Sequence, residues 1–126
     1  MENRIEQKHF IIMELKRILK AVNEVTLISE NDILSKNRLK EIVFARHLYF
    51  YFACEKTRYS LKSIGTFINR DHATVIHGNK RILYELEYYP EVKHIVKRID
   101  FKLKNIDDKW LNYHIINNNI NISHTL

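Results

Sequence analysis

The chain has 126 residues with a formal net charge of +6, and 45% of the residues are hydrophobic and 29% charged. This size and balance exclude a wholly disordered chain or a pair of domains, and the positive charge favours polyanionic partners such as nucleic acid or an anionic membrane face. With only two glycines and one proline, the chain lacks the turn residues of sandwiches and barrels, so we expect an all-α fold, a small multi-helix domain.

The first part of the chain shows helical periodicity. Over residues 5–22 the apolar side chains recur at spacings of four, three, one and three, which places them on one face of a helix. They are Ile11, Leu15, Ile18, Leu19 and Val22. Residues 25–29 are then expected to form a connector, residues 30–34 a short helical turn and residues 35–38 a basic loop.

Residues 39–54 are apolar almost all the way round a helix, so this segment should be central to the fold. Residues 48–52 also have the aromatic composition of a strand. We favour a helix because the run contains no Gly or Pro and because a lone strand would have no partner. Cys54, the single cysteine, is expected to be a small buried hydrophobe in a reducing compartment.

Two further helices are predicted on either side of a break at Asn69 and Arg70. Ser60 is a candidate N-cap for the first helix. Asp71 is a candidate N-cap for the second, because its carboxylate can accept from free backbone N–H groups near Thr74. The inward stripe of the second helix is Val75, Gly78, Ile82 and Leu86. Two helices joined by about three residues form a helix-turn-helix.

The second of these helices has a basic outward face. The residues that project together, away from the inward stripe, are Arg70, Ala73, Thr74, His77, Lys80 and Arg81. Residues in the first turn can reach base edges, whereas Lys80 and Arg81 can neutralise phosphates. A solvated surface helix is the alternative interpretation of such a charge run.

Pro90 is expected to start a last helix that ends near Trp110. We therefore predict one helical domain over residues 1–111, with its motif core at residues 30–86, followed by a flexible Asn-rich tail at residues 112–126. The N-terminus lacks the apolar stretch of a signal peptide, and no run reaches the length of a membrane span. We expect a cytoplasmic protein without a membrane partner.

Four segments carry a family resemblance. They are Ser35–Arg38 (Ser-Lys-Asn-Arg), Ala45–His47 (Ala-Arg-His), Ser60–Gly65 (Ser-Leu-Lys-Ser-Ile-Gly) and Arg70–His77 (Arg-Asp-His-Ala-Thr-Val-Ile-His). In order and spacing they resemble the C-terminal DNA-binding domain of the bacterial replication initiator DnaA. The Arg-Asp-His-x-Thr-Val run is among the most characteristic strings of that domain. The resemblance implies sequence-specific binding of double-stranded DNA through the helix-turn-helix.

The resemblance also implies a role for individual residues. Base contacts in the major groove are implied for Asp71, His72, Ala73 and Thr74. Arg38, the arginine of the Ser-Lys-x-Arg loop, is implied to enter the minor groove, where A·T-rich DNA concentrates negative potential. Arg46 and Lys62 match positions near the DNA backbone. Further phosphate contacts are expected from Lys36, Arg70, His77, Lys80 and Arg81.

The chain departs from the family pattern at several points. Ala73 stands where the family has a threonine, which removes a hydroxyl but keeps a methyl able to touch thymine. The stretch from Ile64 to Arg70 is slightly shorter than in many members, so the angle between the two helices is expected to differ. No Gly-x-x-x-x-Gly-Lys-Ser/Thr phosphate loop occurs, so we expect neither nucleotide binding nor nucleotide-driven unwinding.

Other functions have weaker support. His72 and His77 are five residues apart and so do not share a metal as an i, i+4 pair does, and no cofactor is indicated. A nuclease using Asp71 and His72 is disfavoured because capping and base contact already account for both. The apolar belt from Phe44 to Phe52 leaves a protein-interaction module open. We expect a non-enzymatic accessory or regulator of replication or transcription.

Overall fold

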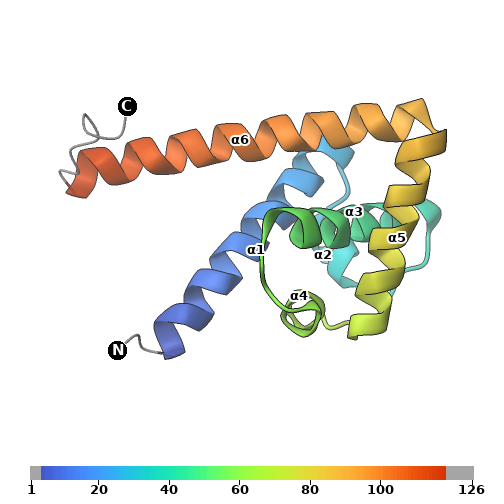
Figure 1. Cartoon of the computed structure of the whole chain (residues 1–126), viewed down its shortest axis with the longest axis horizontal. Helices are drawn as coiled ribbons and strands as arrows, with labels where there is room; N and C mark the ends of the chain where they lie inside the picture. The colour runs from blue at the N-terminus through green and yellow to red at the C-terminus, as the bar shows by residue number, and fades with distance from the viewer. Residues whose placement is uncertain (1–3, 119–126) are drawn as a thin grey trace.

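The computed structural model describes the backbone of residues 4–118 and the side chains of residues 7–105. Within that span all regular structure is helical, which confirms the predicted all-α class. The helices are α1 (Arg4–Thr26), α2 (Glu30–Leu34), α3 (Lys40–Lys56), α4 (Leu61–Phe67), α5 (His72–Tyr88) and α6 (Pro90–Asn118). Figure 1 shows α3 near the centre, with α6 along one side and α5 at one end.

Helix α3 supplies much of the core and packs against α1, α2, α4 and α5. Tyr49 and Phe50 are completely buried, and the Tyr49 hydroxyl donates to the backbone carbonyl of Ile64 at 2.9 Å. A buried phenol needs such a partner because an unpaired hydroxyl in an apolar core is costly. The apolar belt is therefore helical core and does not offer the protein-interaction surface considered above, although Phe44 and Tyr51 are only partly buried.

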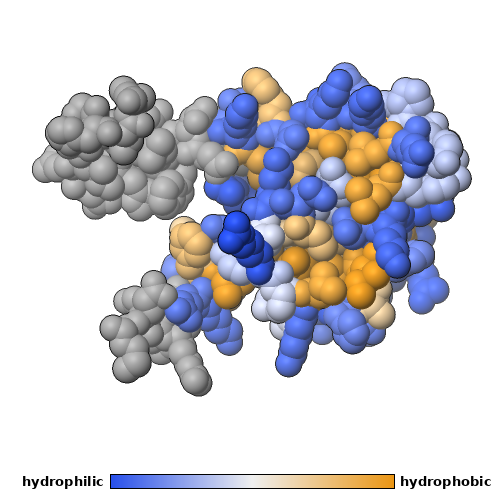
Figure 2. Space-filling view, viewed as in Figure 1, coloured by the Kyte–Doolittle hydropathy of each residue, from blue (hydrophilic) through white to orange (hydrophobic). Residues whose placement is uncertain are grey.

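Helices α1 and α6 pack against each other; α1 also contacts α4, whereas α6 lies on the side of the molecule away from α4. Lys102 of α6 forms an ion pair with Glu24 of α1 at 3.5 Å, and Asp100 of α6 forms one with Lys56 of α3 at 2.8 Å. Figure 2 shows hydrophilic side chains spread over one face of the molecule, with apolar side chains visible between them. The buried stripe of α6 is Val92, Val96, Ile99 and Leu103.

Helix α6 is longer than the sequence predicted. It extends to Asn118 rather than ending near Trp110, because the chain has no proline or glycine after Pro90 to stop a helix. Part of the predicted tail, residues 112–118, is therefore helical, and residues 119–126 lie outside the described residues. No helix in the described part of the chain is both long and apolar enough to span a membrane.

Cys54 is partly buried rather than fully enclosed. Burial and the nearby Glu55 carboxylate raise the pKa of the Cys54 thiol. A raised pKa lowers the fraction of thiolate, which is the reactive form. The geometry is consistent with an unreactive, structural cysteine.

Candidate nucleic-acid interface

Helices α4 and α5 form the predicted helix-turn-helix. The Ser60 hydroxyl accepts from the backbone N–H of Ser63 at 3.0 Å and so caps α4, as its sequence position indicated. At the end of α4 the N–H of Arg70 donates to the carbonyl of Gly65 at 2.8 Å, which is the long bond of a Schellman motif. Asn69 takes the left-handed conformation that this motif requires, with φ of 58°.

At each of the two glycines of the chain, the backbone of the helix-turn-helix lies close to a neighbouring segment. A Cβ atom at Gly65 would collide with the carbonyl oxygen of Arg70, because the turn folds back directly onto α4. A Cβ atom at Gly78 would lie 2.5 Å from the Phe50 ring and 3.0 Å from the His47 ring. Glycine at these positions thus sets the turn and allows α5 to pack closely on α3.

The first turn of α5 is organised by Asp71. One carboxylate oxygen of Asp71 accepts from the backbone N–H of Thr74 at 2.9 Å and from its hydroxyl at 2.8 Å, which confirms the predicted N-cap. Both bonds lower the pKa of the Asp71 carboxyl, the bond from the Thr74 backbone N–H more than the bond from its hydroxyl. His72 and Ala73 are exposed beside this cap. The segment proposed from the sequence to touch bases therefore begins a helix with its side chains accessible.

The outward face of α5 is exposed along its length, opposite the buried Val75 and Ile82. His77 and Lys80 project from it. Arg81 lies on the same face, but its guanidinium is bound to Glu85 at 2.9 Å, so part of its charge is neutralised within the protein.

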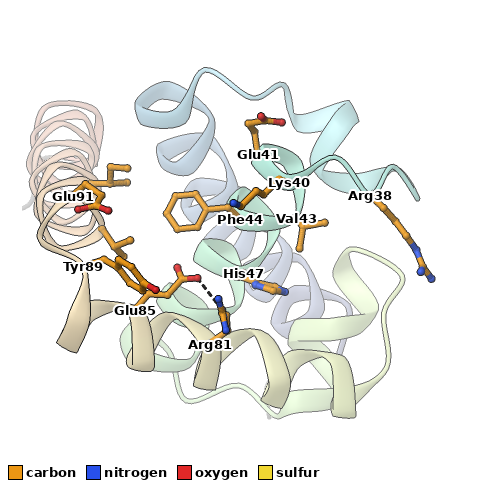
Figure 3. A pocket seen from close by; sticks show the side chains of 12 residues that line it. Arg38, Lys40, Glu41, Val43, Phe44, His47, Arg81, Glu85, Tyr89 and Glu91 are labelled. Atoms are coloured by element: carbon orange, nitrogen blue, oxygen red, sulfur yellow. Dashed lines mark hydrogen bonds and ion pairs between the residues drawn. The ribbon is translucent and has the colours of Figure 1, made fainter.

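A short loop after α2 carries the other predicted DNA contacts. Ser35, Asn37 and the start of α3 organise it: the Asn37 N–H donates to the Ser35 hydroxyl at 3.2 Å, and the Leu39 N–H donates to the Asn37 side-chain oxygen at 2.9 Å. Lys36 and Arg38 are exposed on this loop. Arg38 is one of the residues that line a groove of about 710 Å³, and Figure 3 shows its side chain extending away from the body of the molecule.

The position of Arg46 contradicts the predicted phosphate contact. This residue of α3 is only 6% exposed. Its Nε donates to the Ile33 carbonyl at 2.8 Å, and its Nη2 donates to the carbonyls of Ser35 and Asn37 at 2.8 and 3.2 Å. These carbonyls lie at the end of α2 and in the following loop, where helical partners are missing. Arg46 is buried because it binds the loop from inside.

Arg70 is also engaged within the protein. One terminal nitrogen, Nη1, donates to the carbonyl of Ile68 at 2.9 Å, at the end of α4. The other, Nη2, donates to the Ser35 carbonyl at 2.6 Å. The side chain is partly buried, and its guanidinium therefore joins the helix-turn-helix to the Arg38 loop rather than standing free for a phosphate, as the sequence had suggested.

His47, which the sequence did not single out as functional, packs behind α5. Its ring meets the ring of His77 edge to face, with the centroids 5.6 Å apart. Burial and the neighbouring His77, Arg46 and Arg81 lower the pKa of His47 to about 4. The side chain is neutral at physiological pH as a result and supports α5 without adding charge.

A sequence comparison with known protein families supports the same assignment. The family model described as "Bacterial dnaA protein helix-turn-helix" matches residues 15–82, which is more than half of the chain. This chain belongs to the bacterial DnaA helix-turn-helix family. It carries a DNA-binding helix-turn-helix.

Within this DnaA helix-turn-helix, Lys62 is exposed on α4, on the partner helix of the unit. The described residues contain no group of three or more His, Cys, Asp or Glu side chains placed to hold a metal ion.

Arg46 is the one charged residue among the buried core residues of α3. A charge inside an otherwise apolar run was the available signal for its internal role, because a buried guanidinium requires several acceptors.

Proposed function

We propose that the chain binds double-stranded DNA at specific sites, with Asp71–Thr74 in the major groove and Arg38 in the adjacent minor groove. One observation carries this proposal: the Arg70 guanidinium, at the start of α5, donates to the Ser35 carbonyl at 2.6 Å. That bond places the Arg38 loop beside the first turn of α5, and both are exposed. A helix in the major groove with an adjacent basic arm in the minor groove is an arrangement used by other DNA-binding folds.

The side chains of the first turn suggest how bases are read. The exposed His72 imidazole can exchange hydrogen bonds with base edges, and the Ala73 methyl suits the methyl group of thymine. The Thr74 hydroxyl donates to Asp71 in the free protein, so we assign its base contact to the methyl group. Arg38 is expected to favour A·T-rich sequence, because a narrow minor groove attracts its charge.

Selection of bound duplexes from a randomised pool tests the proposal directly. We expect a recovered site with an A·T-rich part, which Arg38 reads, next to a part that depends on His72 and Ala73. Arg38→Ala should weaken binding to that site by about tenfold while leaving binding to unrelated duplexes less affected. Arg98→Ala, at an exposed position of α6, is the control, because it also removes one positive charge but lies outside the proposed interface. A recovered pool without sequence preference would contradict the proposal.

The phosphate contacts are proposed for Lys36, Lys62, His77 and Lys80, which are all exposed. Lys80→Ala should weaken binding to every sequence alike and reduce the slope of log Kd against log salt by about one, because one fewer counterion is released. Arg81 should contribute less, since Glu85 already pairs with it. Fluorescence anisotropy at several salt concentrations measures both slopes, and an unchanged slope for Lys80→Ala removes that residue from the interface.

We propose further that the domain affects replication or transcription by occupying its sites rather than by catalysis. Asp71 and His72, the pair considered for a nuclease, support this assignment, because the Asp71 carboxylate already caps α5 through Thr74. Supercoiled plasmid incubated with the protein and Mg²⁺ should stay intact. Nicking that Asp71→Asn abolishes would instead assign a hydrolytic activity to the same residues.

A further inference from the structure

Two arginines from distant parts of the chain converge on one backbone oxygen. Arg46 of α3 donates to the Ser35 carbonyl at 2.8 Å through Nη2, and Arg70 of the helix-turn-helix donates to the same oxygen at 2.6 Å through its own Nη2. Two guanidinium groups repel each other, so placing both at a single carbonyl costs electrostatic energy. The hydrogen bonds that each group makes to further carbonyls offset this repulsion.

Each guanidinium also binds the end of a short helix. Arg46 reaches the Ile33 carbonyl at the end of α2 at 2.8 Å, and Arg70 reaches the Ile68 carbonyl at the end of α4 at 2.9 Å. The last carbonyls of a helix have no intrahelical donor and carry the negative end of its dipole, so a cation is favourable there. The pair of arginines thus joins the ends of α2 and α4 across the Ser35 carbonyl.

We propose that Arg46 and Arg70 are positioning residues that hold the Ser35–Arg38 loop at a fixed place relative to the first turn of α5. The inference rests on the proposed function, because it explains how Arg38 is aimed at one groove while Asp71–Thr74 occupy the next. The nitrogens of a guanidinium lie at separate, fixed positions, so one arginine side chain can bind carbonyls of two different segments, and we expect arginine to be required at both positions. A lysine keeps the charge but loses this geometry.

A double-mutant cycle between Arg38 and Arg70 tests the coupling. Binding of wild type, Arg38→Ala, Arg70→Lys and the double variant is measured on the duplex selected with the wild-type protein. Arg38→Ala should cost about tenfold in the wild type but about threefold or less in Arg70→Lys, because a loop that is no longer fixed aims Arg38 poorly. Equal losses in both backgrounds would show that Arg70 acts independently of the loop and overturn the proposal.

Hydrogen exchange in the free protein separates this proposal from the function on which it rests. The amides of Asn37 and Leu39 donate within the loop, and Arg70→Lys should speed their exchange by about fivefold while leaving amides of α6 unchanged. Unchanged loop exchange overturns the positioning role even if DNA binding is intact. If Arg38→Ala has no effect on DNA binding but Arg70→Lys accelerates exchange of the loop amides, the proposed minor-groove contact is wrong. The role of the two arginines in holding the loop then still stands.

Arg46→Lys gives the second variant, with Arg98→Lys as the control that makes the same exchange at an exposed site on α6. Because Arg46 is buried, its variant is first checked for folding by circular dichroism. The same acceleration of the Asn37 and Leu39 amides is expected. A folded Arg46→Lys protein with wild-type loop exchange would overturn the role of that residue.

Discussion

The two regions that we propose to contact DNA are held in place in different ways. The first turn of α5 is fixed by contacts three residues apart, from Asp71 to Thr74. The Ser35–Arg38 loop has local bonds at the Asn37 and Leu39 amides, but it is also held by Arg46, 11 residues beyond Ser35, and by Arg70, 35 residues beyond it. Local contacts form with little loss of chain entropy, whereas distant ones require the tertiary fold. The helix is therefore largely preformed, and the loop depends on the rest of the domain.

Removing the distant support should have the largest effect. Arg46→Ala removes a donor from the carbonyls of Ile33, Ser35 and Asn37, and of these three the Ser35 carbonyl keeps Arg70 as a second arginine donor. We expect a loss of about 3 kcal/mol in the free energy of unfolding, measured by urea denaturation. Arg98→Ala, at an exposed position of α6, should change it by less than about 0.5 kcal/mol. Comparable losses for the two variants would show that the buried bonds contribute little.

The turn of the helix-turn-helix is the next most sensitive point. Gly65→Ala introduces a Cβ against the carbonyl of Arg70, which is backbone and cannot rotate away. We expect a loss of about 2 kcal/mol in unfolding free energy, because the turn must open to admit the methyl group. Thr66→Ala, at an exposed position of the same helix, is the control for a change to alanine. Wild-type stability in Gly65→Ala would mean that the turn moves to admit the methyl group at no cost in unfolding free energy.

Acid should weaken the support behind α5 through His47, the residue next to Arg46 on α3. Its pKa is about 4 in the folded protein, below the ordinary value of 6.5, so the unfolded chain binds the proton more readily. The stability that neutral His47 contributes is present above about pH 6.5 and is lost as the pH falls towards 4. About 1–2 kcal/mol should disappear over this window. His47→Gln should flatten this part of the profile, and an unaltered profile would assign the acid sensitivity to other groups.

The local cap should have the smallest effect of the four. Asp71→Ala removes the acceptor for the Thr74 N–H and hydroxyl and should lower Tm by a few degrees. Asp71→Asn keeps a side-chain oxygen at the same place and should lie close to the wild type. Thermal unfolding followed by circular dichroism measures both. A loss as large as that of Arg46→Ala would show that the first turn of α5 is not locally determined.

Features that depend on near neighbours along the chain could be predicted from the amino-acid sequence. The scarcity of glycine and proline, together with helical periodicity, predicted the all-α class. Ser60 and Asp71 marked the starts of α4 and α5 because a capping side chain bonds within three residues. The exposed face of α5 followed from the same periodicity. The resemblance in the Arg70–His77 segment led to the family that the chain proved to belong to.

Which arginines are accessible could be seen only in the folded protein. Arg38, Arg46 and Arg70 are all basic residues near the motif, but only Arg38 of the three is exposed; Arg46 and Arg70 donate hydrogen bonds to the Ser35 carbonyl. The length of α6 was also missed, because no residue after Pro90 is a strong helix stop. A side chain's partners depend on which distant backbone atoms the fold brings within reach. Spacing along the chain does not contain that information, so the loop's support became visible only in three dimensions.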